Sequence, residues 1–594
     1  VTLTMDDFIF GSLGTEAKRL AHVRGQRAGV THLQRRSPRD PAPGQAVTLE
    51  LSLGPAYPQD RAWAYWTADG SDPAGAGGVA AAGQVAALTP VDADWDTLVW
   101  GYVRRFRGVL PGQPAGTVVR YRLAAGGRGP EVWADAGAYY GYYVDDDPPP
   151  AWTRDAILYQ IFADRFFSAD PDFPQVEAKP SHKANGTLRG ITAQLGYIAA
   201  LGANCLWITP VFPSPSYHGY DATDFFGINP RLGTPADYQM LIDQAHARGM
   251  RVLMDFVPNH WSDQHASFQA ALRDPNSPSA AWYTFKHWPD DYETFFGVKD
   301  LPQLNLRHPA ARAHVLDAAK YWLDFGVDGF RVDYCIGPTP DFYADFRRVT
   351  RAANPECWTF GEAVDPPDSQ LTFAGGMDGA LDFMLLEALR QTFAYGEWDA
   401  ARLADFLDRH EAYYPPDYSR PSFLDNHDMN RFLWAAQGDQ RRLRLAALCQ
   451  FTLAGPPIIY YGTEVGLSQD RDIRQGGWAL HEEARLPMPW GEAQNAGLLT
   501  FYRDLAWFRR QTPALRGGTR ETLVAEGRLL AYRRADAAGR CVTVLNLDTQ
   551  PAALTLAIPE TAVALTTDSA CQAAAGADGV RVSLPPLAGV LLTI

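Results

Sequence analysis

The sequence predicts an α/β protein: a (β/α)₈ TIM barrel with an inserted subdomain after its third strand, flanked by N-terminal and C-terminal β-sandwich domains. Three observations lead to this prediction. Short β-like runs separated by turns fill both ends of the chain, strand and helix patterns alternate between them, and charged residues gather where the central strands end. We place the domains at 1–148, 149–514 and 515–594.

The first segment alternates β-like runs with turns rich in Gly, Pro and Asp. The runs are "AVTLELSL", "AWAYWTA", "TLVWGYVRRF" and "VVRYRLAA". Regularly spaced short strands with turn signals are typical of a β-sandwich. The stretch "DDDPPP" at 145–150 then indicates a linker, because three successive prolines cannot continue a strand or helix.

The central segment alternates strands with helices. The eight candidate strands are "ILYQIF", "ANCLWIT", "RVLMDF", "DGFRVD", "CWTFGE", "MDGALDF", "PSFLDN" and "PIIYYG". Between most of them lie helical patterns, such as "PAARAHVLDAAKYWLDFG", whose apolar stripe is Val315, Ala318, Ala319, Trp322 and Leu323. Eight such units predict a barrel whose reactive groups stand at the C-terminal strand ends.

Two further segments complete the predicted organisation. Residues 257–308, between the third and fourth strands, are too long for an ordinary loop and predict a small inserted subdomain beside the active face. From 515 the chain returns to β-like runs, "RLLAYRRA", "CVTVLNLD", "AALTLAI" and "GVLLTI". These runs predict the second β-sandwich.

Composition narrows the class of partner. The formal net charge of −15 argues against nucleic acid and anionic membranes, which require clustered Lys and Arg. The 12% aromatic content suits stacking on sugar rings. The six cysteines are scattered in apolar runs and are interpreted as core residues. No run reaches the roughly 18 apolar residues of a membrane helix, so we expect a soluble protein, either cytoplasmic or secreted with its signal removed.

Polar residues occupy the C-terminal ends of several candidate strands. They are Asp255, Asn259 and His260 in "DFVPNH", Arg331 and Asp333 in "GFRVDYC", Glu362 in "FGEAV", and His427 and Asp428 in "LDNHD". In one barrel these ends converge on a single cleft. Cleaving an acetal requires one group that protonates the leaving oxygen and another that stabilises or captures the oxocarbenium carbon, which paired carboxyl groups provide. The set therefore predicts glycosyl chemistry.

The four motifs, in this order, resemble the signature regions of glycoside hydrolase family 13, the α-amylase family, and the resemblance covers most of 150–594. It implies that Asp333 is the nucleophile, Glu362 the general acid/base and Asp428 the third carboxylate, which steadies the distorted sugar. Arg331 would hold Asp333 ionised, because an adjacent cation lowers the pKa of a carboxyl group.

The same resemblance implies the substrate-binding residues. His260 and His427 would bind hydroxyl groups of the sugar at the cleavage point, and Tyr220 in "HGYDATDF" would stack beneath that sugar. Arg331 and Asp255 are placed in the same substrate-binding set.

A finer resemblance comes from "DYETFFGVKDLPQLN", which is similar to the inserted domain of cyclomaltodextrinases, neopullulanases and maltogenic amylases. Those enzymes also carry an N-terminal β-sandwich, which lies over a partner's active site, so the resemblance implies a homodimer. The chain departs from them after Asp333. They usually show Asn-Glu where this chain has Ile336 and Gly337, and common α-amylases show Lys-His there.

The resemblance implies no required cofactor, with calcium as a possible addition. Asn259 matches a calcium ligand of many α-amylases, but their His ligand falls at Gly337. A second family site, in the loop "FFSADPDFPQ", keeps Asp170 and Asp172, while its distant Asp partner appears as Thr187. A hard cation needs about six oxygen ligands.

We therefore expect a retaining hydrolase of α-1,4-glucosidic bonds in maltooligosaccharides, cyclodextrins, starch or pullulan, with transglycosylation also possible. An ordinary endo-acting α-amylase is the alternative within the same class. A non-catalytic glucan-binding protein on the same fold is the alternative from another class. Such a protein would be expected to have lost a carboxylate, whereas Asp333, Glu362 and Asp428 are all present.

Overall fold

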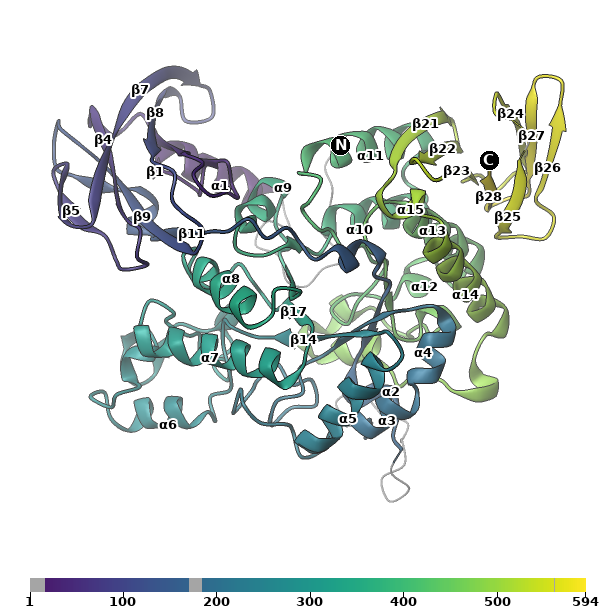
Figure 1. Ribbon diagram of the computed structural model, residues 1–594, viewed down its shortest axis with the longest axis horizontal. Coiled ribbons are helices and arrows are strands. Elements are labelled where there is room, and N and C mark those ends of the chain that lie inside the picture. Colours follow the sequence, from purple (N-terminus) through teal and green to yellow (C-terminus); the bar gives the residue numbers. More distant parts are fainter. Residues whose placement is uncertain (1–15, 170–183, 560) are drawn as a thin grey trace.

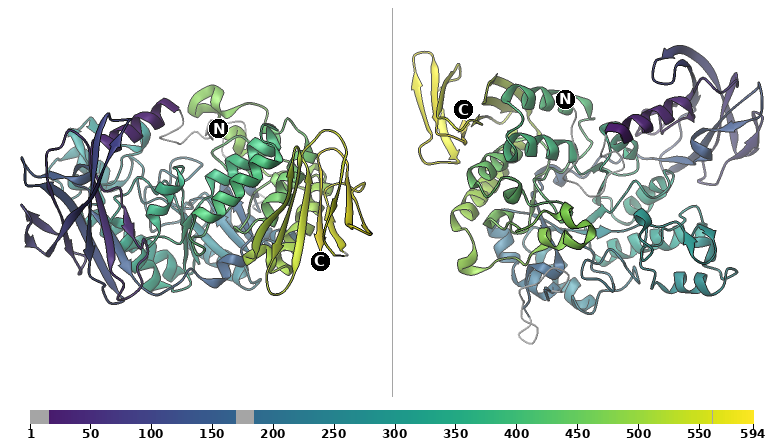
Figure 2. Two further views of the ribbon diagram at one scale, coloured as in Figure 1. Left: turned by 90° about the horizontal axis from the view of Figure 1, so that it is seen from above. Right: turned by 180° about the vertical axis from the view of Figure 1, so that it is seen from behind.

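The computed structural model describes residues 16–169, 184–559 and 561–594. A central barrel carries one β-rich domain on each side, the N-terminal domain at the left of Figure 1 and the C-terminal domain at the right. Both views of Figure 2 keep the two domains apart, at opposite sides of the barrel. We retain 1–148, 149–514 and 515–594 as the proposed domain boundaries.

The barrel wall is a seven-stranded sheet in the order β19-β18-β17-β14-β13-β12-β20. Every neighbouring pair in it is parallel. The strands are β12 (Leu158–Ile161), β13 (Cys205–Ile208), β14 (Arg251–Phe256), β17 (Gly329–Val332), β18 (Trp358–Gly361), β19 (Gly379–Ala380) and β20 (Ile458–Tyr460). They correspond to seven of the eight predicted strands.

The remaining predicted strand, "PSFLDN", closes the barrel through isolated bridges instead of a continuous ladder. Ser419 pairs with Gly379 and Ser422 pairs with Pro457, both in the parallel sense. The physical reason lies in the sequence, because Pro421 has no backbone N–H to donate to a ladder. The (β/α)₈ barrel is closed, but only a few hydrogen bonds join its seventh strand to the neighbouring strands.

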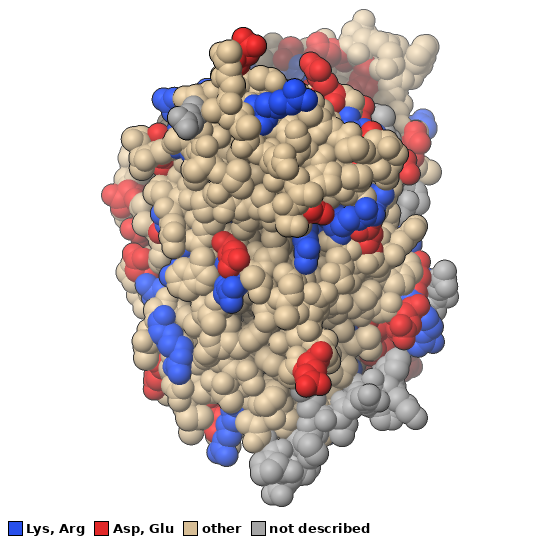
Figure 3. Space-filling model, turned by 90° about the vertical axis from the view of Figure 1, so that its right-hand side faces the viewer, with Lys and Arg blue, Asp and Glu red and all other residues tan. Residues whose placement is uncertain are grey.

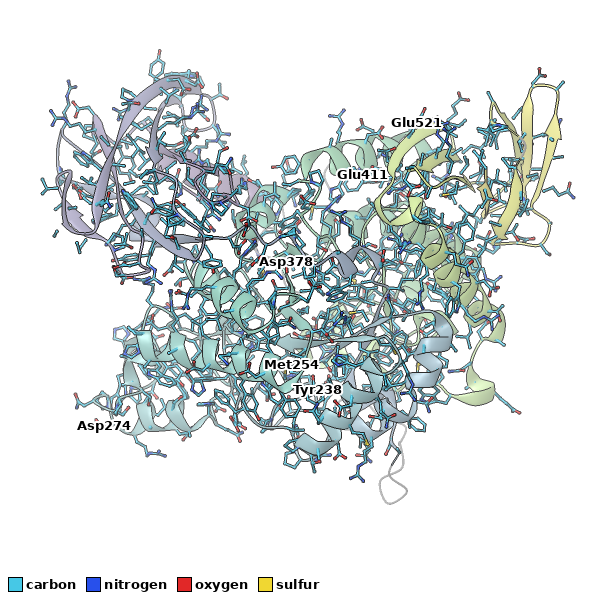
Figure 4. All side chains as sticks on the ribbon, viewed as in Figure 1. Tyr238, Met254, Asp274, Asp378, Glu411 and Glu521 are labelled. Carbon is cyan, nitrogen blue, oxygen red and sulfur yellow. The ribbon has the colours of Figure 1, made fainter. Side chains whose placement is uncertain are left out.

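The helices of the barrel follow the expected signals. In α7 (Pro309–Phe325), all five residues of the predicted apolar stripe are buried. In α5 (Pro235–His246), Thr234 and Asp237 form a capping box, and Pro235 stands at the first turn. Tyr238 of α5 and Met254 of β14 share the barrel core, and Figure 4 labels both. The other principal helices are α3 (Leu188–Ala193), α4 (Leu195–Leu201), α8 (Phe342–Ala353), α10 (Phe383–Leu389), α11 (Ala400–Tyr413), α13 (Gln440–Thr452) and α14 (Ala496–Gln511).

The segment 257–308 folds as a small helix and hairpin between β14 and α7. It contains α6 (Ala266–Arg273) and the strands β15 (Phe285–His287) and β16 (Asp291–Tyr292), which pair antiparallel. A short turn of helix, Phe295–Gly297, follows the hairpin. The hydroxyl group of Tyr283 accepts a hydrogen bond from Trp261 Nε1 at 2.7 Å, which links the start of the segment to the part that carries the hairpin.

The N-terminal domain is a nine-stranded sheet that folds over at one long strand, β7 (Gln84–Asp96). The first part of β7 pairs with β4 and its last part pairs with β8. The sequence reasoning missed β7, whose Pro90 and alternating aspartates obscure its β pattern, and it missed α1 (Glu16–Ala28). The other strands are β1 (Val30–Thr31), β2 (Arg36–Ser37), β3 (Val47–Leu53), β4 (Arg61–Thr67), β8 (Gly101–Leu110), β9 (Thr117–Gly126), β10 (Val132–Trp133) and β11 (Tyr140–Val144).

The C-terminal domain pairs a five-stranded sheet with a three-stranded sheet around an apolar core. The five-stranded sheet contains β21 (Thr519–Glu526), β22 (Leu529–Ala535), β23 (Arg540–Asn546), β28 (Ala588–Thr593) and β25 (Ala562–Thr566). The smaller one contains β24 (Ala552–Leu556), β27 (Gly579–Leu584) and β26 (Gln572–Gly576).

The surface and the cysteines agree with the compositional arguments. Basic and acidic side chains are interspersed on the face shown in Figure 3. All six cysteines are buried and carry free thiols. Within the described ranges, no helix is both long enough and apolar enough to cross a membrane.

Candidate active site

Neighbouring strands bring the predicted polar residues to one edge of the barrel. Asp255 of β14 lies opposite Arg331 of β17, and Val332 lies opposite Gly361 of β18, so Asp333 and Glu362 follow adjacent strand ends. A cavity of about 490 Å³ opens at this edge. Its lining includes Tyr220, His260, Asp333, Glu362 and Asp428.

Arg331 is the centre of the carboxylate cluster and is fully buried. Its Nη1 donates to Asp255 Oδ1 at 2.8 Å and to Asp333 Oδ1 at 2.7 Å. Its Nη2 forms an ion pair with Glu362 Oε1 at 2.7 Å. One guanidinium therefore holds carboxylates from three successive elements, which explains why a buried strand carries charged residues.

Two of the three carboxyl groups beside Arg331, those of Asp333 and Glu362, have raised pKa values. Burial raises the pKa of Asp333, and Arg331 opposes that rise. We had expected Arg331 to keep the pKa of Asp333 low. In this cavity burial outweighs the guanidinium, and the carboxylates of Glu362 and Asp255 add to the rise. Burial likewise raises the pKa of Glu362, which favours the protonated form that a general acid needs.

Asp428 has the opposite electrostatic environment. Burial acts to raise its pKa, but His427 and then Arg485 hold it below its ordinary value. Arg485 Nη2 donates to Asp428 Oδ1 at 2.7 Å, and His427 Nε2 lies 2.9 Å from Asp428 Oδ2. Asp428 is therefore kept ionised while Glu362 is biased toward the neutral acid.

Tyr220 joins the cavity to the residues behind it. Its ring stacks on that of His427, with centroids 5.4 Å apart and planes 8° apart. Its hydroxyl donates to Asp255 Oδ2 at 2.8 Å and lies 2.8 Å from His427 Nε2. Asp255, Arg331 and His427, which we predicted to bind substrate, do not line the cavity and lie directly behind its wall.

Asn259 and His260 follow β14 and contact each other. Asn259 Nδ2 lies 3.1 Å from His260 Nδ1, and burial lowers the pKa of His260 to about 3, so the imidazole is neutral. Asn259 Oδ1 has no hydrogen-bond partner among the described residues. A Cβ added to Gly337 would lie 2.1 Å from this oxygen, so the turn at Gly337 packs directly against it.

The residues around Asn259 do not fit a calcium ion. The opposing residue is a glycine without a side-chain ligand, and the described residues contain no cluster of three or more His, Cys, Asp or Glu side chains that could hold a metal. Thr187 Oγ1 accepts from Gly190 N and caps α3. Asp170 and Asp172 lie outside the described residues.

The structure adds three groups of lining residues that sequence reasoning missed. One group precedes Tyr220 and consists of Ser216, Tyr217 and His218. Residues near the end of a helical segment, Ile473–Arg485, line the cavity with His481, Glu482 and Arg485. The inserted segment lines it with Phe295, Val298 and Leu301. The charged stretch "HEEAR" was the one available signal for the group in the helical segment. The inserted segment was predicted to lie beside the active face, and "DYETFFGVKDLPQLN" contains all three of its residues, but no pattern in the sequence distinguishes these apolar side chains from ordinary core.

Comparison with known proteins agrees with this geometry. The model of the α-amylase catalytic domain matches residues 160–513. Alpha-amylase 2 of Dictyoglomus thermophilum is 43% identical over 378 residues, which are 63% of this chain and 66% of that protein. Neopullulanase 2 of Thermoactinomyces vulgaris is 32% identical over 433 residues, 69% of this chain and 72% of that protein.

A solved cyclomaltodextrinase structure superimposes with a TM-score of 0.70 at 27% identity, covering 95% of this chain and 99% of that one. This match includes the flanking domains as well as the barrel. The catalytic-domain match covers more than half of the sequence and spans the barrel residues that carry the three carboxylates. The chain therefore belongs to the α-amylase family of glycoside hydrolases.

Proposed function

We propose that this chain hydrolyses α-1,4-glucosidic bonds of maltooligosaccharides and cyclodextrins with retention of anomeric configuration, and that it also acts on starch or pullulan. The observation that carries the proposal is the placement of Asp333 and Glu362 on one buried guanidinium, at adjacent strand ends in the same cavity. Relatives named neopullulanase and cyclomaltodextrinase support this choice of substrates.

In the proposed first step, Glu362 protonates the glycosidic oxygen while Asp333 attacks the anomeric carbon, which gives a covalent glycosyl ester and releases the shortened glucan. Glu362, now ionised, then takes a proton from water, whose oxygen displaces Asp333. Burial raises the pKa of both carboxyl groups, so the division of roles rests on position. Arg331 Nη1 donates to Asp333 Oδ1 at 2.7 Å, which favours the ionised nucleophile, and Glu362 holds the proton. The ionised Asp428, held by Arg485, would bind hydroxyl groups of the distorted sugar and favour the developing positive charge.

The test separates the two carboxyl groups. Glu362→Gln should slow cleavage of natural maltooligosaccharides by roughly 10²–10⁴-fold, because their sugar leaving groups need a proton. It should still react with α-maltosyl fluoride, whose leaving group does not. The ester should then accumulate, and mass spectrometry of peptides should find one maltosyl unit on the peptide that contains Asp333.

The matched variant is Asp333→Asn, which should lose both activities and form no adduct. An adduct on Asp428, or product of inverted configuration, would show that these roles are wrongly assigned. The alternative, an ordinary endo-acting α-amylase, is distinguished by comparing time courses on β-cyclodextrin and soluble starch. An enzyme of that class would degrade starch and leave the ring substrate largely intact.

Two finer proposals concern assembly and calcium. We propose a homodimer in which the N-terminal domain of one copy narrows the active site of the other. Sedimentation velocity tests whether the protein in solution has the mass of two chains. Calcium binding by the loop that contains Asp170 and Asp172 also stays a prediction. If this loop binds calcium, dialysis against EDTA should lower the Tm of the protein, and adding calcium back should restore it.

A further inference from the structure

Tyr334, the residue after Asp333, has an unusual backbone conformation. Its φ of 40° lies in the left-handed region, which side chains other than glycine rarely adopt without compensating contacts. In this conformation its backbone N–H donates to Glu362 Oε2 at 3.2 Å. The other oxygen of the same carboxyl group, Oε1, faces Arg331 Nη2. One short segment, 331–334, therefore contacts both oxygens of the proposed acid/base.

Aromatic contacts from the inserted segment hold the Tyr334 ring. Phe295 packs against it edge-on, with centroids 4.9 Å apart and planes 90° apart, and Phe296 lies 5.1 Å away. Phe295 is 8% exposed, lines the cavity and also contacts the His260 ring at 4.5 Å. The ring of Tyr334 therefore joins the inserted segment to the turn that follows Asp333.

The turn itself closes tightly around the same ring. Gly337 N donates to the Tyr334 carbonyl at 3.0 Å, and a Cβ at Gly337 would lie 2.8 Å from Tyr334 Cδ1 and 2.1 Å from Asn259 Oδ1. Real Cβ atoms do not approach other atoms so closely, so this turn requires glycine here. The absence of a side chain at 337 and the presence of the ring at 334 are two parts of one packing arrangement.

We propose that Tyr334 is a positioning residue for Glu362. The contacts of its ring with Phe295 and Phe296 hold the left-handed backbone, and that backbone directs the amide N–H at the Glu362 carboxyl group. The inserted segment thus controls the acid/base through Tyr334, in addition to forming a wall of the cavity. This inference rests on the role proposed above for Glu362.

The direction of the effect follows from the hydrogen bond. A donor to a carboxylate favours the charged form, so the N–H of Tyr334 lowers the pKa of Glu362 against the rise that burial causes. Losing the bond would raise that pKa further. The charged and titratable groups close to Glu362 are Arg331, Asp333, His427, Asp428, the Cys335 thiol and the phenol of Tyr334 itself. A substitution at 334 removes only the phenol, and Tyr334→Phe controls for that loss.

The experiment measures the pH dependence of kcat/KM for maltotetraose, whose sugar leaving group needs the proton, so the basic limb reports the acid in the free enzyme. Tyr334→Ala removes the ring that holds the backbone, and the basic limb should move up by roughly one pH unit. Tyr334→Phe keeps the ring and should retain the wild-type limb. The rate at the pH optimum on maltotetraose should fall about tenfold in the Ala variant. The rate on α-maltosyl fluoride, which needs no acid, should stay within about twofold.

Any of three results would overturn the inference. The basic limb of the pH profile could stay at its wild-type position in Tyr334→Ala, or it could move by the same amount in Tyr334→Phe. The Ala variant could also lose rate equally on maltotetraose and on α-maltosyl fluoride. If Tyr334→Ala does not fold, Tyr334→Gly serves, because glycine accepts this φ and also lacks the ring. Glu362→Gln, assayed in parallel, separates this inference from the proposed function. If that variant cleaves maltotetraose at the wild-type rate, the role of Glu362 is wrong. If Glu362→Gln loses activity on maltotetraose as expected, and Tyr334→Ala shows the wild-type basic limb in its pH profile, only the positioning role of Tyr334 is wrong.

Discussion

The two flanking β domains differ in whether their apolar core is separate from that of the barrel. The N-terminal domain has an apolar core of its own, separate from that of the barrel. The C-terminal domain contributes residues to the barrel core itself, including Leu530, Leu545 and Leu591. The first domain can therefore fold around its own interior, whereas part of the interior of the second is shared with the barrel.

Ion pairs dominate the contact of the N-terminal domain with the barrel. Arg120 Nη2 donates to Asp345 Oδ2 at 2.7 Å, and Arg312 Nη1 donates to the same oxygen at 2.7 Å. Arg347 of α8 binds Asp145 through two hydrogen bonds of 2.7 Å, where both side chains are buried. Such a contact depends on exact geometry, because unpaired buried charges are costly.

Apolar packing dominates the contact of the C-terminal domain. Leu545 and Leu591 lie in one core with Leu448 of α13, and a Cβ at Gly589 would lie 3.0 Å from Leu448 Cδ2. A hydrogen bond of 2.5 Å between the Tyr532 hydroxyl and Thr452 Oγ1 also crosses this contact. Ion pairs are also present, such as Arg520 Nε with Glu411 Oε2 at 3.2 Å. Figure 4 labels Glu411 on α11 and Glu521 on β21, on the side where this domain meets the barrel. A shared core makes the two parts one cooperative unit.

The largest effect should come from removing residues 515–594. The barrel would expose Leu448 and its apolar neighbours on α13 to water, so we expect an aggregated product without a cooperative thermal transition. Circular dichroism on heating and size-exclusion chromatography measure this. If the truncated protein is monomeric and melts at the wild-type temperature, the barrel does not depend on the C-terminal domain, and the contrast between the two flanking domains is wrong.

Removing residues 1–148 should instead leave a folded barrel. Its core is separate from that of the removed domain, so a cooperative transition should persist. If the N-terminal domain narrows a partner's active site, the ratio of starch to β-cyclodextrin activity should rise. An unchanged ratio in a truncation that still unfolds cooperatively would count against that arrangement.

A smaller effect is expected from one buried ion pair. Arg347→Met leaves Asp145 buried without its partner, which should lower the free energy of unfolding by about 3–5 kcal/mol. The double variant Arg347→Met/Asp145→Leu should recover most of this loss, because the buried charge of Asp145 is removed with its partner. Asp40 also loses a contact with Arg347 in both variants, but its side chain is 46% exposed. Urea unfolding measures both. The comparison would weaken if the double variant were as unstable as the single one.

The smallest effect concerns pH at the same interface. Burial acts to raise the pKa of Asp72, but hydrogen bonds from Arg307 and Arg120 lower it overall. A depressed carboxyl pKa gives stability that is present above the unfolded value of 3.8 and is lost as the pH falls through the folded value. Below about pH 4, pepsin should therefore cut the 145–150 linker faster. Asp72→Asn should be cut at a rate that depends less on pH.

The sequence by itself determined the elements that depend on local pattern. The strand runs, the apolar stripe of α7 and the polar residues at strand ends follow from side-chain periodicity and from the topology of a barrel. Asp333, Glu362 and Asp428 could be placed in one cleft for that reason. The seventh strand was located correctly, but its reduction to isolated bridges reflects the proline within it.

Only the tertiary structure decided which distant groups complete the site. Arg485 reaches Asp428 across 57 positions of the chain, and Phe295 reaches Tyr334 from the inserted segment. It also decided that Asp255, Arg331 and His427 stand behind the cavity wall, and that the C-terminal domain shares the barrel core while the N-terminal domain has a core of its own. Periodicity shows which face of an element is buried, but the identity of the facing partner depends on how the elements pack.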